Sequence, residues 1–209
     1  SKAILYTEKA IEFAKKNNLN NKLADCYLQL GNIYYNLKKN NLAIDFFIRA
    51  INLYNKKEPK TNLALSYYGL GKCYLRKDNI QVAEIYFEKS ASLYRELNFF
   101  EAIELINLQK GIIKKEKKNY TEATEILKSV TENLSDDTFL TTKIEAFIQL
   151  GEIEMAQEKY NSAINYYNLA NTINEANKTD FETTKRVFKQ LSLAYEKTQN
   201  TSQSLFFLK

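Results

Sequence analysis

The chain has 209 residues, 44% of them hydrophobic, with 30 basic and 25 acidic residues for a net charge of +5. These proportions supply a continuous core and exclude an intrinsically disordered chain. Only four basic residues are Arg, which argues against a nucleic-acid surface, and no apolar run is long enough to cross a bilayer.

Helix breakers are rare, with five Gly and one Pro, so we expect ten or eleven helices joined by short turns. Asn79, Asn119 and Asn200 stand at three of the joints, where Asn caps a helix well. In chain order the predicted helices cover residues 1–17, 21–37, 41–55, 61–77, 80–96, 99–117, 120–133, 137–157, 161–177, 181–198 and 202–209.

A strong internal repeat runs through these segments. Its anchors, spaced by 40, 40, 40 and 41 residues, are Gly31, Gly71, Gly111, Gly151 and Ser192. Twelve positions after each anchor comes another small residue: Ala43, Ala83, Ala123, Ala163 and Ser204. Four positions further on comes a larger apolar or aromatic residue: Phe47, Phe87, Leu127, Tyr167 and Leu208.

The spacing of the repeat has a physical meaning. In most repeats an aromatic residue stands four positions before the anchor, a Leu one before it and a Tyr three after it, which places them on one helix face. Small residues on both helices let the pair approach closely, and the aromatic residues fill the flanks. Each pair leaves an apolar face open, so the pairs must stack.

This pattern resembles the tetratricopeptide repeat (TPR) family. The residues that carry the resemblance are Tyr27, Leu30, Gly31, Tyr34, Ala43, Phe47 and Ala50 in one repeat, and Tyr67, Leu70, Gly71, Tyr74, Ala83, Phe87 and Ser90 in the next. The resemblance implies an all-α fold, a right-handed α-solenoid of antiparallel helix pairs. The usual period is 34 residues, and the 40-residue form resembles kinesin light chains and bacterial peptide-sensing regulators and phosphatase-like adaptors.

We expect a single solenoid over residues 1–209. Residues 1–17 would be the second helix of a truncated repeat. The repeats that follow would cover 20–58, 59–97, 98–134, 135–178 and 179–209, the last incomplete. Because the chain begins and ends inside repeats, without a polar capping helix, we interpret it as a segment of a longer protein.

The third repeat departs from the pattern, with Asn107, Lys110 and Lys114 at core positions and Leu105, Leu108 and Ile112 at positions that face a groove in other repeats. Two explanations stay open. The helix is rotated, so that the apolar residues join the core and burial of unpaired Lys is avoided. Alternatively the register holds, the Lys stems extend outward, and the centre of the groove is apolar.

No catalytic or metal-binding constellation is visible. The chain has no His, which removes the usual base for a Ser or Cys nucleophile. Cys26 and Cys73 align with apolar core positions of other repeats and are interpreted as structural thiols, not as a disulfide. We therefore predict no enzyme activity and no cofactor.

In the family that the chain resembles, the first helices line a groove that binds a protein or peptide. The co-chaperone clamp of Lys and Asn is disfavoured, because Leu28 stands where its Lys should be. A row of Gln that includes Gln29, Gln109 and Gln149 offers amides to an extended peptide backbone. The predicted groove residues are Gln29, Asn32, Tyr35, Asn36, Tyr68, Lys72, Arg76, Leu108, Gln109, Ile112 and Gln149.

The predicted function is a protein- or peptide-binding module, the sensor or scaffold segment of a larger bacterial signalling protein, with an output domain elsewhere in that protein. The alternative is a structural adaptor that bridges subunits of a complex. We expect no nucleic acid as a direct partner and no membrane insertion by this segment. The expected location is cytoplasmic, or extracytoplasmic if a leader has been removed.

Overall fold

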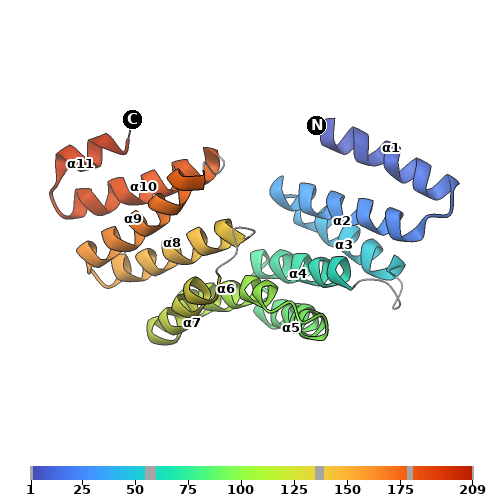
Figure 1. Ribbon diagram of the computed structural model, residues 1–209, viewed down its shortest axis with the longest axis horizontal. Coiled ribbons are helices and arrows are strands. Elements are labelled where there is room, and N and C mark those ends of the chain that lie inside the picture. The colour runs from blue at the N-terminus through green and yellow to red at the C-terminus, as the bar shows by residue number, and fades with distance from the viewer. Residues whose placement is uncertain (1, 55–59, 135–138, 178–180, 209) are drawn as a thin grey trace. The chain divides into compact units, whose positions relative to one another are not determined.

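The computed structural model describes residues 2–54, 60–134, 139–177 and 181–208. These residues form α-helices and no β-strand (Figure 1), which confirms the prediction of an all-α solenoid of paired helices. The helices are α1 (Lys2–Lys16), α2 (Asn20–Asn36), α3 (Asn40–Leu53), α4 (Thr61–Arg76), α5 (Ile80–Glu96), α6 (Glu101–Glu116), α7 (Tyr120–Asn133), α8 (Leu140–Ala156), α9 (Tyr160–Asn177), α10 (Phe181–Lys197) and α11 (Thr201–Phe206).

Two compact units make up the chain, Ser1–Ile106 and Asn107–Lys209, and α6 spans the boundary between them. Within unit 1, each of α1 to α4 packs on the next helix, and α2 also contacts α4. Within unit 2, each of α7 to α10 packs on the next helix, and α8 also contacts α10. The predicted repeat boundaries at 58/59, 134/135 and 178/179 adjoin or fall in residues outside the described ranges and stay a prediction.

The repeat anchors are packing positions. A Cβ added to Gly71 would lie 2.5 Å from Cδ1 of Phe87, and one added to Gly31 would lie 2.6 Å from Cδ1 of Phe47. None of the glycines has a positive φ, so they are needed for close helix approach, not for backbone freedom. In the last pair Ser192 stands at the anchor and Ser204 stands where the other repeats have Ala, and their hydroxyls lie 3.2 Å apart in a hydrogen bond.

The turns between helices also follow the repeat. A left-handed residue ends the first helix of each pair, at Lys38, Asp78, Lys118, Glu158 and Gln199. The two bonds that close such a turn are made by Lys38 N to Tyr35 O (3.0 Å) and by Lys39 N to Tyr34 O (2.9 Å). The predicted caps are present, since Asn79, Asn119 and Asn200 each accept a backbone N–H three residues on.

The register of the third repeat holds, so rotation of its first helix is the wrong alternative. A Cβ added to Gly111 would lie 2.7 Å from Leu127, the same contact as in the other pairs. Lys114 reaches Glu122, with 2.7 Å between Nζ and Oε1. Leu108 is nevertheless buried, as are the residues at the same repeat position in two other repeats, so the groove expected from the second alternative is not fully open.

Cys26 and Cys73 are both free; Cys73 is fully buried and Cys26 partly so. Burial raises the pKa of the Cys73 thiol to about 11.

In the last pair, Leu208 does not fill the core position predicted for it and is 66% exposed, because α11 ends at Phe206.

Candidate binding surfaces on the two units

The predicted groove residues of unit 1 lie on α2 and α4. Gln29, Asn32 and Asn36 are exposed on α2. In the second repeat, the position that holds Gln in the Gln row is occupied by Gly69, and the structure explains this exception. A Cβ there would lie 2.6 Å from Cε1 of Phe47, so the Phe47 ring occupies the space that a Gln side chain needs.

The contact between α2 and α4 brings four of the predicted residues together: Tyr35, Tyr68, Lys72 and Arg76. We name this set the cation–aromatic cluster. The Lys72 ammonium lies 4.6 Å from the ring centroid of Tyr35 and 4.9 Å from that of Tyr68. The Arg76 guanidinium lies 3.6 Å from the Tyr35 centroid. Both cations are thus within cation–π range.

Arg76 is held in place by further bonds. Its Nη1 donates to the Tyr35 carbonyl oxygen at 2.6 Å and to Asn40 Oδ1 at 3.2 Å. The side chain therefore bridges the end of α2 and the start of α3. A guanidinium fixed in this way loses little conformational entropy when it binds an anion, because it is already ordered.

The cation–aromatic cluster carries positive charge without a carboxylate. Within the ranges that the structure describes, neither Lys72 nor Arg76 forms an ion pair with Asp or Glu. Burial, and then the charge of Arg76, lower the pKa of Lys72. Burial also raises the pKa of Tyr35, so its phenol stays neutral. An anion placed here would offset the desolvation of Lys72.

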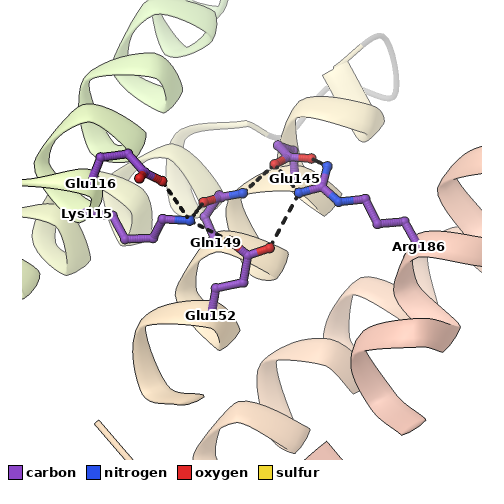
Figure 2. Close-up of polar contacts among 6 residues, drawn as sticks. All are labelled: Lys115, Glu116, Glu145, Gln149, Glu152 and Arg186. Atoms are coloured by element: carbon purple, nitrogen blue, oxygen red, sulfur yellow. Dashed lines mark hydrogen bonds and ion pairs between the residues drawn. The ribbon is translucent and has the colours of Figure 1, made fainter. Parts of the chain in front are cut away.

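In unit 2, the same helix face carries a compensated set of charges, which we name the polar network: Lys115, Glu145, Gln149, Glu152 and Arg186 (Figure 2). It links α6, α8 and α10. The Lys115 ammonium donates to Gln149 Oε1 at 2.6 Å and to Glu152 Oε2 at 2.5 Å. Gln149 Nε2 in turn donates to Glu145 Oε1 at 2.7 Å.

Arg186 completes the polar network from α10. Its guanidinium donates to both carboxylate oxygens of Glu145, and Nη2 lies 3.6 Å from Glu152 Oε1. The pKa of Arg186 is raised: burial works against the charged form, and the charges of Glu145 and Glu152 favour it more strongly. Both cations here are therefore paired, and the network joins three first helices.

The remaining predicted groove residues all belong to unit 2, and they are less accessible. Leu108 and Gln149 are each 4% exposed, and Gln109 and Ile112 are partly buried. Gln149 uses its amide within the polar network. It is therefore not available to a peptide backbone while the network is intact.

Sequence reasoning missed that Lys115, Glu145, Glu152 and Arg186 act together. Each stands at a groove position, but they come from three repeats. A comparison of charge signs at matched groove positions would have found the complementarity, because the two carboxylates on α8 face a cation on each neighbouring first helix. The cation–aromatic cluster was found because its four residues share the groove positions of adjacent repeats.

Among the residues that the structure describes, no cluster of three or more His, Cys, Asp or Glu could hold a metal ion. No helix in the described ranges has the length and apolar character required to cross a membrane.

Comparison with solved structures supports the fold. BtubC (BKLC) from P. vanneervenii matches with a TM-score of 0.74 at 14% identity, over 99% of this chain and 87% of that one. Aspartyl phosphate phosphatase F from Bacillus subtilis has a TM-score of 0.67 at 14% identity, over 99% and 66%. The apo form of RapI has a TM-score of 0.62 at 15% identity, over 99% and 95%.

Sequence comparison identifies the family. No curated protein sequence matches the chain. Family models described as tetratricopeptide repeat match residues 19–96 and 144–177. These matches cover helices α2 to α5 and most of α8 and α9, the pairs in which the Gly and aromatic residues pack as the repeat requires. With the fold and the repeat register in agreement, the chain belongs to the tetratricopeptide repeat family.

Proposed function

We propose that the chain is a protein- or peptide-binding module that captures an acidic, partly apolar segment of a partner on the cation–aromatic cluster. The observation that carries this proposal is the pair of cations on α4, Lys72 and Arg76, held against tyrosine rings with no carboxylate partner among the described residues. Such a pair attracts a carboxylate.

The tyrosine rings define the rest of the ligand. Tyr35 and Tyr68 are partly buried, and both rings lie next to the Lys72 ammonium. A partner side chain that reaches Lys72 must therefore pass apolar ring surface, so acidic residues flanked by apolar ones fit best. The exposed Gln29, Asn32 and Asn36 on α2 supply hydrogen-bonding groups for the neighbouring peptide backbone.

The wider role proposed is that of a sensor or scaffold segment in a larger signalling protein. The 40-residue period of the repeats supports this role, together with the fold shared with RapI and phosphatase F. Binding across α2 and α4 would couple two adjacent repeats, because each helix contributes one ring to the site. A change in their packing is the means by which the ligand could act on an output domain.

The test uses a peptide-display library on the intact chain, followed by fluorescence anisotropy with the selected peptides. We expect selection of sequences with Asp or Glu beside apolar residues. The double variant Lys72→Glu/Arg76→Glu should weaken their binding by roughly a hundredfold or more, with an unchanged melting temperature.

The matched control is Lys185→Glu/Lys189→Glu, which reverses two exposed charges at the same i, i+4 spacing on α10. It should bind the peptides as the unaltered chain does. Equal loss of binding in both double variants would show that the change in net charge alone weakens binding, and it would overturn the assignment of the site.

A further inference from the structure

Four of the five repeats pack one aromatic ring from the first helix against one from the second. The first ring stands four residues before the anchor, and the second stands fifteen residues after it. The ring centroids lie 5.3–6.4 Å apart, within the usual range for aromatic pairs, in the pairs Tyr27–Phe46, Tyr67–Tyr86, Phe147–Tyr166 and Phe188–Phe207.

The third repeat has no ring at either position. Asn107 on α6 and Ile126 on α7 take their places. A hollow of about 300 Å³ lies between these helices, within unit 2, and is lined by Asn107, Lys110, Glu125, Ile126 and Ser129. This volume is at the lower end of the range for ligand sites. The hollow thus lies at the positions that hold a pair of rings in the other repeats.

The lining of the hollow combines apolar surface with two opposite charges. Ile126 contributes apolar surface, and Lys110 stands where four other repeats have Leu. Within the described ranges, Lys110 and Glu125 form no ion pair, either with each other or with another residue. Lys114, at a position that holds Tyr in three other repeats, is already engaged by Glu122.

We propose that this hollow is a second binding site, which receives a tyrosine side chain from a partner protein. The partner's ring would take the place of the ring that the third repeat lacks, in contact with Ile126. This site lies on unit 2 and does not depend on the cation–aromatic cluster of unit 1.

The charges favour tyrosine over phenylalanine. A phenol hydroxyl both accepts and donates a hydrogen bond, so it can accept from the Lys110 ammonium and donate to the Glu125 carboxylate. Phenylalanine would cover the partly buried Lys110 without a bond, which costs free energy. Leucine would lack the flat shape that packs against a neighbouring side chain in the other repeats.

The experiment titrates N-acetyl-tyrosine amide, N-acetyl-phenylalanine amide and N-acetyl-leucine amide into the isotope-labelled full chain and follows backbone amide shifts. We expect saturable shifts at Gly111 and Ile126, with the tyrosine probe bound roughly two- to tenfold more tightly than the phenylalanine probe. Equal shifts for all three probes, or none up to the solubility limit, would overturn the proposal.

Three variants test the geometry. Asn107→Phe supplies the missing ring from within the chain, so it should abolish binding of the tyrosine probe and raise the melting temperature. Asn107→Ala keeps the hollow open and should retain binding. Lys110→Met should remove the preference for tyrosine over phenylalanine. Full binding by Asn107→Phe, or an undiminished preference in Lys110→Met, would contradict the proposal.

The two proposed sites can fail separately. Lys72→Glu/Arg76→Glu should leave binding of the tyrosine probe unchanged, and Asn107→Phe should leave binding of the selected acidic peptides unchanged. Loss of both ligands in either variant would show that the two sites are not independent.

Discussion

The cation–aromatic cluster of unit 1 and the polar network of unit 2 occupy equivalent helix faces. They differ in whether their cations are paired with carboxylates. In unit 1, Lys72 and Arg76 lie against tyrosine rings without a carboxylate among the described residues. In unit 2, Lys115 and Arg186 are bonded to Glu145, Gln149 and Glu152. On one face the cations have no described carboxylate partner, and on the other the charges join helices.

One cause is the residue at a single position of the repeat. The position that follows the anchor holds Lys72 on α4 and Glu152 on α8. A carboxylate at that position can satisfy cations from both neighbouring first helices, as Glu152 does. A cation there meets Tyr35 on the neighbouring helix instead. The sign of the charge at this repeat position therefore decides whether the neighbouring first helices find a carboxylate there.

The largest predicted effect tests the register that makes the two faces comparable. Gly71→Leu in unit 1 and Gly151→Leu in unit 2 should each lower the free energy of unfolding by about 1–3 kcal/mol through overpacking. The added side chains would meet the buried rings of Phe87 and Tyr167. Urea unfolding measures the loss, and Glu84→Leu on the exposed side of α5 is the control. Unchanged stability in either glycine variant would mean that the assigned register is wrong.

The second prediction compares the contributions of Lys115 and Lys72 to stability. Lys115→Met should lower the free energy of unfolding by about 1–3 kcal/mol, because the partly buried Glu152 and the buried Gln149 lose their donor. Lys72→Met should leave stability unchanged or raise it, since it removes a partly buried cation that has no described carboxylate. The same urea series measures both. A greater loss for Lys72→Met would reverse the comparison.

The smallest predicted effect is a pH dependence of peptide binding. Capture of an acidic peptide needs charged Lys72, whose pKa is lowered by burial and by Arg76. Affinity should therefore be complete at neutral pH and fall as the pH rises through a value below the ordinary 10.5 of Lys. In Lys72→Arg the charge persists, because Arg does not deprotonate in this range, so affinity should hold to higher pH. Anisotropy titrations at several pH values measure this, and identical profiles would exclude a role for Lys72 ionisation.

Much of the fold followed from the sequence because the repeat is encoded locally. Helix ends agreed closely with expectation, as in α5, where Ile80–Glu96 coincides with the predicted 80–96. Asn79 and Asn119 act as caps through bonds within three residues of chain. The packing of Gly71 on Phe87 also followed, because both residues belong to one repeat and the spacing alone defines their contact.

The candidate sites were predicted only in part. The groove role of Tyr35, Tyr68, Lys72 and Arg76 stays a prediction. The sequence also did not show that both cations lie against the Tyr35 ring, which depends on the contact between α2 and α4. Gln149 was predicted as a peptide contact and is buried in the polar network instead. Glu145 lies one turn before Gln149 on α8, but the Lys115 ammonium on α6 reaches Gln149 only because the helices stack.

The sequence by itself determined the helices, their caps, the pairing within each repeat and the family, since all of these depend on residues fewer than about twenty positions apart. Tertiary structure alone decided which charges are neutralised and which hollows stay open. Lys115 forms an ion pair with Glu152, Arg186 forms one with Glu145, and Lys72 lies against tyrosine rings. The physical reason is that ion pairing and burial depend on distances between atoms of different repeats. Which of several possible partners a side chain contacts is fixed only when the helices have packed.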